Sequence, residues 1–222
     1  PERYAAILVD LLPNRAGLVP VSRAFVEAAR ELATRHGALL IIDEVISLRL
    51  GPHGLSGTYG VEPDLLTAGK IIGGGFPIGA VLGRGEVMRD LDPRSPDALP
   101  HSGTFWANPV TMAAGAAALR LLTDAEIDRL GGLGDALRRD VGARVAAAGW
   151  EVRGHGSLAR PFPQGVTNVP LALQHRLWWA AYERGLLLWG NGVALSTPMT
   201  APVARDIGER LADADLAVAD AS

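Results

Sequence analysis

The stretch GALLIIDE, residues 37 to 44, decides the fold. Its apolar run from Ala38 to Ile42 begins after a glycine and ends at two acidic residues, Asp43 and Glu44. An uninterrupted apolar run of this length between turn residues is typical of a strand that is covered on both faces. The stretch therefore predicts a central strand of a parallel sheet, with Asp43 at the carboxyl end of that strand.

The residues before this strand complete a βαβ unit. Ile7 to Leu12 is a second apolar run, interrupted by Asp10, and Ser22 to His36 has apolar residues at helical spacing. Ser22 suits the N-cap of this helix and Gly37 suits its end. Strand, helix and strand in this order predict a parallel sheet with helices on its faces.

The residues after it predict two further strands, at Leu65 to Ala68 and at Ile78 to Leu82. Pro109 suits the first position of a helix that continues through the alanine-rich segment from Met112 to Leu122. The character of the chain then changes. We predict an α/β domain over residues 1–122 and a smaller α+β domain over residues 123–222.

The second domain is predicted to contain three helices and three short strands. The helices are expected at Asp124 to Ala148, with a break at Gly131 and Gly132, at Leu171 to Arg184 and at Pro202 to Leu216. The strands are expected at Trp150 to Arg153, Leu186 to Trp189 and Val193 to Ser196.

Composition excludes several classes of protein. The chain has 222 residues, a net charge of -3 and no cysteine, so it lacks the concentrated positive face that nucleic acids and anionic membranes require, and it has no thiol ligand or nucleophile. Its five histidines form no HxxxH or HxH pair, and we expect no metal site. No apolar run approaches the ~20 residues of a membrane span, so we expect a cytoplasmic protein.

The segment DLLTAGKIIGGGF, residues 64 to 76, contains Lys70, the only lysine among 21 basic residues. Lys70 follows a predicted strand, as Asp43 does. Both side chains are therefore expected at the carboxyl edge of one sheet, where open α/β sheets bind ligands. The simpler interpretations are that Lys70 is a solvated surface charge and that Asp43 caps a turn. The segment lacks the glycine and the hydroxyl residue of a P-loop.

Together these residues suit pyridoxal 5'-phosphate. A lysine amine forms a Schiff base with its aldehyde, and an aspartate beside its ring nitrogen keeps the ring protonated, which makes the ring an electron sink. Gly103 and Thr104, just before the helix that begins near Pro109, offer backbone N–H groups, a hydroxyl and a nearby helix N-terminus for the phosphate.

Three blocks of the sequence resemble the class III aminotransferases of the fold type I pyridoxal-phosphate enzymes, which include glutamate-1-semialdehyde aminomutase. The blocks are ALLIIDEV at 38–45, DLLTAGKIIGGGFPIGAVLG at 64–83 and HSGTFWANPVTMAAG at 101–115. The resemblance implies that residues 1–122 are part of a fold type I large domain, with a mostly parallel sheet, and that a small C-terminal domain follows. The chain starts with Pro1, close to a strand, and corresponds to the C-terminal half of the family.

The resemblance also implies roles for individual residues. Lys70 would be the Schiff-base lysine, Asp43 the partner of the pyridine nitrogen, and Val45 would pack against one face of the ring. Thr104, next to Gly103, would reach the phosphate of the neighbouring subunit's cofactor, which implies a homodimer with shared active sites. The expected activity is transfer of an amino group between an amino-acid donor and a keto-acid acceptor.

Within the family, DEVISLRLGPHGL at 43–55 and HSGTF at 101–105 are similar to the β-amino-acid aminotransferases of the β-phenylalanine type. Those enzymes have Arg-Gly where this chain has Asn191-Gly192, and a neutral amide cannot replace a guanidinium that holds a carboxylate. Arg49 could supply the charge or form a structural salt bridge, and Asp10 stands in place of the usual glutamate. Two alternatives remain open: an aminomutase with the same residues, and an inactive half-enzyme that serves as a dimerisation or binding module.

Overall fold

The computed structural model describes residues 4–188, 190 and 192–219, and the chain divides into two compact units. The first is formed by Pro1–Leu12 and Val21–Asp124, and the second by Pro13–Pro20 and Ala125–Ser222. Each unit has its own sheet, so each is described by itself.

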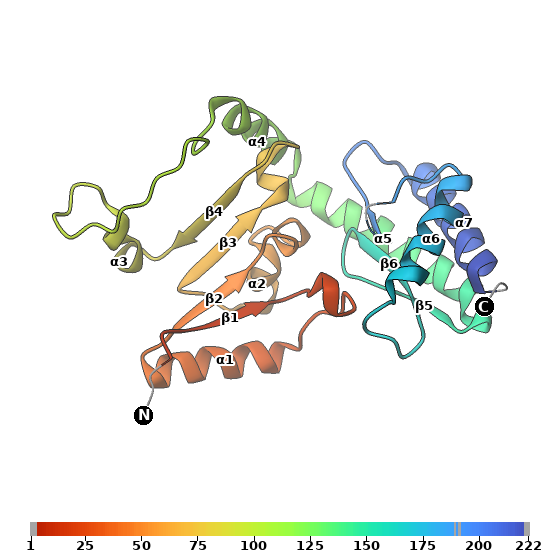
Figure 1. Ribbon diagram of the computed structural model, residues 1–222, viewed down its shortest axis with the longest axis horizontal. Helices are drawn as coiled ribbons and strands as arrows, with labels where there is room; N and C mark the ends of the chain where they lie inside the picture. The colour runs from red at the N-terminus through yellow and green to blue at the C-terminus, as the bar shows by residue number, and fades with distance from the viewer. Residues whose placement is uncertain (1–3, 189, 191, 220–222) are drawn as a thin grey trace. The chain divides into compact units, whose positions relative to one another are not determined.

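The first unit is built on a four-stranded sheet in the order β1-β2-β3-β4 (Figure 1). Its strands are β1 (Ala6–Asp10), β2 (Leu39–Asp43), β3 (Leu65–Gly69) and β4 (Gly79–Gly83). The pairs β1·β2 and β2·β3 are parallel, whereas β3·β4 is antiparallel. The predicted α/β fold with a mostly parallel sheet is confirmed.

Helix α1 (Arg23–His36) packs against β1 and β2, and its ends lie where the sequence predicts them. The Ser22 side chain accepts a hydrogen bond from the Phe25 N–H at 3.2 Å, and Gly37 ends the helix in the left-handed conformation, with φ at 64°. Val26 and Ala33 are fully buried in this helix, and burial of a valine side chain contributes roughly 1.5 to 3 kcal/mol. The helix thereby covers one face of the sheet at the strands that precede the acidic residues.

Asp64 fixes the start of β3. Its buried carboxylate accepts a hydrogen bond from the Leu40 N–H of β2 at 2.6 Å and forms ion pairs with Arg30 at 2.8 Å and Arg84 at 2.7 Å. Burial raises the pKa of this carboxyl, but the Leu40 N–H and the two guanidinium groups outweigh burial and lower the pKa overall. β2, β3 and α1 are thus held in one arrangement by a single side chain.

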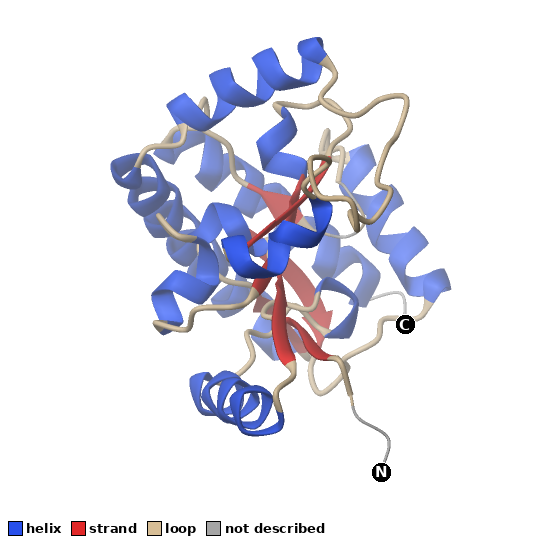
Figure 2. Ribbon diagram, turned by 90° about the vertical axis from the view of Figure 1, so that its left-hand side faces the viewer, coloured by secondary structure: helices blue, strands red, loops and turns tan. Residues whose placement is uncertain are grey.

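The remaining elements of the first unit are short, apart from one helix. They are η2 (Ser47–Leu50), α2 (Gly54–Tyr59), η3 (Lys70–Gly73), α3 (Gly85–Met88), η4 (Arg89–Leu91) and α4 (Pro109–Leu121), where η denotes a 3-10 helix. Residues 92–108 contain neither helix nor strand, and they belong to the tan segments of Figure 2. Pro109 occupies the start of α4, as predicted.

The second unit has a three-stranded antiparallel sheet in the order β5-β6-β7, together with three long helices. Its elements are η1 (Asn14–Ala16), α5 (Asp124–Val145), η5 (Ala146–Ala148), β5 (Trp150–Arg153), β6 (Leu158–Pro163), α6 (Leu171–Glu183), β7 (Val193–Ala194) and α7 (Ala201–Ala219). Helices α6 and α7 pack against each other.

The predicted break at Gly131 and Gly132 is wrong, because α5 runs through both residues without interruption. Two glycines in a helix cost about 1 kcal/mol each relative to alanine. Burial of Leu130, Leu137 and Val141 on the same helix offsets that cost, and tertiary packing overrides the local preference.

The predicted strand at Leu186 to Trp189 is also wrong as far as it is described. Leu186 to Leu188 have no strand structure, and Trp189 lies outside the described residues. Strand β6, by contrast, was not predicted, because Pro161 and Pro163 argue against a central strand. Among the described residues, β7 pairs with Leu158 and Ala159 of β6, whereas Pro161 and Pro163 pair with β5.

Candidate functional site

Three polar residues form a row at the carboxyl edge of the first unit's sheet. In the strand register Asp10 of β1 pairs with Asp43 of β2, and Asp43 pairs with Thr67 of β3. Lys70 follows directly after β3. The prediction that strand ends bring Asp43 and Lys70 to one edge agrees with this topology.

The Asp43 carboxylate is held through one of its two oxygens. Its Oδ1 accepts hydrogen bonds from the Val45 N–H at 2.9 Å and from the Thr67 hydroxyl at 3.0 Å. No residue in the described part of the chain donates a hydrogen bond to Oδ2. The half-buried side chain is therefore oriented by the protein while one oxygen is left to bind a donor.

Lys70 has a strained backbone. Its φ of 49° places an exposed, non-glycine residue in the left-handed region, which costs roughly 1 to 2 kcal/mol. A glycine would adopt this conformation without the cost, and this segment contains glycines at other positions. Strain that persists at a residue with a reactive side chain is a feature of functional sites.

Val45 lies beside the residue that precedes Lys70. A side chain at Gly69 would place its Cβ 3.3 Å from Val45 Cγ1 and 3.6 Å from Val45 Cγ2, closer than most side chains pack. Gly69 therefore leaves room for Val45 at the end of β3. The structure brings Val45, Asp43 and Lys70 together at the same pair of strand ends.

Glu44 anchors the loop that follows β2. Its fully buried carboxylate accepts hydrogen bonds from the Leu55 N–H at 3.2 Å, the Ser56 N–H at 2.7 Å and the Ser47 hydroxyl. A carboxylate with three donors is a stable buried arrangement. Because Asp43 and Val45 flank Glu44, this anchor also limits how far the two site residues can move. Sequence analysis did not single out Glu44.

Gly54 tests this anchor. An alanine Cβ there would lie 2.6 Å from Glu44 Oε1. We expect Gly54→Ala to lower the free energy of unfolding by about 2 to 4 kcal/mol, since the substitution combines backbone strain at φ of 71° with this clash.

The matched control is Gly60→Ala, because Gly60 has φ of 66° and its Cβ would meet only an Arg23 side-chain nitrogen at 3.8 Å. This variant should show the backbone cost alone, about 1 kcal/mol. The free energy of unfolding in urea checks both. Equal losses would mean that Glu44 is not fixed where the structure places it.

The pKa of Asp10 responds to the charges of the other site residues. Burial raises the pKa of its carboxyl, and the Leu12 N–H at 2.9 Å opposes this by stabilising the charged form. The nearby carboxylates of Asp43 and Glu44 raise this pKa further, whereas Lys70 lowers it. Asp10 is thus close enough to both Asp43 and Lys70 for their charges to act on it.

Of the three glycines that follow Lys70, Gly74 is the one that allows a helix to pack closely. A Cβ on Gly74 would lie 2.3 Å from the Ala114 carbonyl oxygen of α4, and a Cβ on Gly115 would lie 2.1 Å from the Ile72 carbonyl oxygen. The backbones of η3 and α4 can approach this closely only where both sides lack side chains. The segment that carries Lys70 is therefore supported from one side by α4.

The predicted phosphate-binding residues lie in an exposed turn before α4. Gly103 is needed there because a Cβ would meet Trp106 Nε1 at 2.3 Å, and Thr104 is exposed. The N-terminus of α4, however, is capped by Asn108, whose side chain accepts hydrogen bonds from the Val110 N–H at 3.0 Å and the next N–H at 3.3 Å. These two N–H groups are therefore occupied by Asn108, and the role of Gly103 and Thr104 toward a phosphate stays a prediction.

What remains for an anion is the Thr104 hydroxyl and the backbone of the turn. No hydrogen bond or ion pair connects Gly103 or Thr104 with Asp43 or Lys70 within the part of the chain that the structure describes. The structure thus assembles Asp43, Val45 and Lys70, and it shows no bond between them and the turn at residues 103–104 in the described part of the chain.

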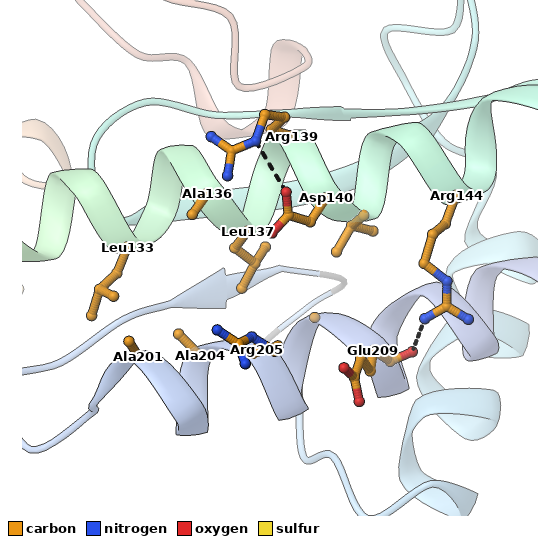
Figure 3. Close-up of a pocket in the computed structure, with 12 residues that line it drawn as sticks. Leu133, Ala136, Leu137, Arg139, Asp140, Arg144, Ala201, Ala204, Arg205 and Glu209 are labelled. Carbon is orange, nitrogen blue, oxygen red and sulfur yellow. Dashed lines mark hydrogen bonds and ion pairs between the residues drawn. The ribbon is translucent and has the colours of Figure 1, made fainter.

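A groove in the second unit lies between α5 and α7 and has a volume of about 340 Å³ (Figure 3). Its floor is apolar, and Gly208 lets the helices approach, since a Cβ there would lie 3.3 Å from Val141 Cγ2. Arg144 bridges the helices through the Glu209 carbonyl oxygen at 3.2 Å and an ion pair with Asp213 at 2.6 Å. None of the predicted site residues lines this groove.

The described residues contain neither a metal-binding cluster nor a membrane-spanning helix. No cluster of three or more histidine, cysteine, aspartate or glutamate side chains could hold a metal ion within residues 4–188, 190 and 192–219. Over the same residues, no helix has both the length and the apolar character that crossing a bilayer requires.

Comparison with known proteins identifies the family. Residues 1–201 match the family described as "Aminotransferase class-III". The chain belongs to the class III aminotransferase family. The resemblance inferred from the three sequence blocks is confirmed, and the family match extends from the first unit into the second.

Two curated relatives of this class III chain have different activities in their names. It is 45% identical to the beta-phenylalanine transaminase of Variovorax paradoxus over 74% of this chain and 38% of that protein. It is 48% identical to the glutamate-1-semialdehyde 2,1-aminomutase of Caldivirga maquilingensis over 54% of this chain and 28% of that protein. The class III chain therefore spans less than half the length of these relatives.

The fold agrees with that of a solved class III-like structure. A transaminase with PLP bound superposes with a TM-score of 0.89 at 38% identity, over 97% of this chain and 53% of that one. The predicted fold type I architecture is therefore confirmed for this class III chain, which accounts for about half of such a protein.

The residues expected to hold a substrate carboxylate are less defined in this class III chain. Arg49 lies half-buried in η2, and burial lowers the pKa of its guanidinium. Asn191, which stands where related enzymes carry arginine, lies outside the described residues. The role of Arg49 as a carboxylate ligand stays a prediction.

Proposed function

We propose that this chain carries the lysine-bearing part of the active site of a pyridoxal-phosphate-dependent aminotransferase, which moves an amino group between an amino acid and a keto acid. The observation that carries the proposal is the pairing of a strained Lys70 with an Asp43 carboxylate that keeps one oxygen free. An amine and an oriented carboxylate at the carboxyl edge of a parallel sheet are the two groups that this cofactor needs from a protein.

The residues fit the cofactor in type and in position. Pyridoxal phosphate, when bound, supplies an aldehyde that bonds to an amine and a pyridinium ring that takes up electrons. Lys70 would contribute the amine, and its Nζ, once neutral and released, would move a proton to or from a neighbouring carbon. Asp43 Oδ2 would accept the hydrogen bond of the ring nitrogen, and Val45 would pack against the ring.

Substrate and assembly are part of the same proposal. We assign a β-amino acid as the amino donor from the beta-phenylalanine transaminase relative, which is 45% identical over 74% of the chain. We assign Gly103 and Thr104 to the phosphate of a neighbouring subunit's cofactor, so the active protein would be a homodimer with shared sites. Their exposure in a turn supports a role toward a second subunit.

The proposal is tested by incubating the full chain with pyridoxal phosphate and reducing the mixture with borohydride. We expect one equivalent of cofactor to become permanently attached, and peptide mapping should locate it at Lys70, because no other lysine exists. Absence of the label, in a chain whose circular dichroism shows a folded protein, would overturn the proposal and favour the inactive binding module.

An aminomutase is the second candidate, since an aminomutase relative is 48% identical over 122 residues. The two activities use the same residues and differ in whether an external acceptor is required. Turnover of a β-amino acid that depends on added 2-oxoglutarate or pyruvate identifies the aminotransferase. Amino-group exchange within glutamate-1-semialdehyde, without any added acceptor, identifies the aminomutase.

A further inference from the structure

We propose that Thr67 is a positioning residue that decides which oxygen of Asp43 the protein presents to the cofactor ring. This inference rests on the proposed function, because it assigns a role toward the same cofactor. Thr67 acts through Asp43, and it is given no contact with the cofactor itself.

The position of Thr67 follows from the strand register. Asp43 and Thr67 are directly paired residues of the parallel strands β2 and β3, and they are the last such pair between those strands. Paired residues on neighbouring parallel strands point to the same side of the sheet, with the strands about 4.8 Å apart. The Thr67 hydroxyl can therefore reach the Asp43 carboxylate, and the observed Oγ1 to Oδ1 distance is 3.0 Å.

The two donors to Oδ1 differ in what they fix. The Val45 N–H belongs to the loop that follows Asp43, the last residue of β2, so its hydrogen bond of 2.9 Å moves with that loop. The Thr67 hydroxyl belongs to the neighbouring strand β3, so its hydrogen bond fixes the position of the carboxylate relative to the sheet. A carboxylate held by the Val45 N–H alone could rotate, so that either of its two oxygens would accept that hydrogen bond. The second bond removes this freedom and leaves Oδ2 as the presented oxygen.

The presented oxygen matters because the ring nitrogen needs a carboxylate in a defined direction. A misplacement of about 1 Å in a supporting group can cost about 100-fold in function. A hydrogen bond to a charged group contributes about 1.5 to 3 kcal/mol, which corresponds to about 10-fold or more in a binding constant. Both arguments place the expected effect of the Thr67 hydroxyl within measurable range.

A competing explanation is that Thr67 is merely a good strand residue, because threonine is β-branched. The variant Thr67→Val keeps the branched shape and removes the hydroxyl, whereas Thr67→Ser keeps the hydroxyl and removes a methyl group. A structural role predicts that the serine variant is the more affected of the two. A positioning role predicts the reverse.

The experiment compares two cofactors on the full chain. One is pyridoxal phosphate, and the other is its carbocyclic analogue, in which a C–H group replaces the ring nitrogen. Dissociation constants are measured by equilibrium dialysis for the wild type, Thr67→Val and Thr67→Ser. We expect Thr67→Val to bind pyridoxal phosphate about 10-fold more weakly and the analogue unchanged, since only the first uses Asp43 Oδ2. Thr67→Ser should restore the wild-type value.

Three outcomes would overturn the inference. Equal weakening of both cofactors in Thr67→Val would show that Thr67 supports the strand and not the carboxylate. Unchanged binding of both would show that the hydroxyl has no role, while labelling of Lys70 in the wild type would leave the proposed function intact. A wild-type chain that is not labelled at Lys70 would remove the proposed function and this inference together.

Discussion

Replacing Lys70 with alanine, glycine or arginine is expected to abolish borohydride-fixed attachment of pyridoxal phosphate completely, whereas the stability of the three variants should differ. The label is lost because alanine and glycine have no amine, and because a guanidinium does not attack an aldehyde at neutral pH as a lysine amine does. The arginine variant keeps the positive charge near Asp10, so it separates the need for charge from the need for an amine.

The stability of these variants tests the backbone strain at the same residue. With φ at 49°, alanine keeps the steric cost of a Cβ in the left-handed region, whereas glycine removes it. We expect Lys70→Gly to exceed Lys70→Ala in free energy of unfolding by about 1 kcal/mol, even though glycine has the more flexible unfolded chain. Urea denaturation of the chain without cofactor measures this difference.

The two measurements answer different questions. If alanine proves more stable than glycine, the left-handed conformation of Lys70 is wrong, and its strain carries no argument for function. If any of the three variants still becomes labelled, the cofactor attaches at another residue, and the assignment of the Schiff-base amine to Lys70 is wrong. A chain that loses its label and gains stability on changing Lys70 to glycine would show directly that stability is sacrificed here for an amine.

The sequence predicted the reactive groups of the site better than their supports. Asp43 and Lys70 could be found because each follows an apolar run, and strand ends in a parallel sheet meet at one edge. Thr67 could not be found in this way, because its role depends on the register between two strands, which a local sequence pattern does not predict. The role of Glu44 was also missed, because two of its three hydrogen-bond donors lie 11 and 12 residues further along the chain.

Elements of the fold failed where local rules and packing disagree. The helical spacing of α1 and its cap residues agreed with one another, and its ends were predicted correctly. Local rules predicted a helix break at the glycine pair of α5 and no strand at the prolines of β6. Tertiary contacts overrode both rules. The sequence also did not predict that Asn108, one residue before Pro109, would cap α4 by accepting hydrogen bonds from its first free N–H groups.

The largest expected effect on stability concerns Asp215 of α7, which is fully buried and whose two carboxylate oxygens have no hydrogen-bond partner in the described part of the chain. Burial raises the pKa of this carboxyl well above its ordinary value. Below about pH 4 the group is protonated in both folded and unfolded chains and costs nothing. As the pH rises above that value, only the unfolded chain releases the proton, so the free energy of unfolding falls by about 1.4 kcal/mol per pH unit until the folded pKa is passed.

Asp215→Asn removes this pH dependence while keeping the shape of the side chain. We expect the free energy of unfolding of the variant to rise relative to that of the wild type as the pH increases above about 4, the ordinary pKa of an aspartate, as measured by urea denaturation at a series of pH values. A fixed offset from the buried amide does not change with pH, so the slope of the difference carries the result. The control is Asp213→Asn on the same helix, whose exposed ion pair with Arg144 contributes less than about 1 kcal/mol.

A pH-independent difference between wild type and Asp215→Asn would mean that this carboxyl has a charge partner in the folded protein, in conflict with its surroundings in the structure. A rising difference, together with an unchanged yield of Lys70 labelling in the variant, would show that Asp215 acts on stability alone.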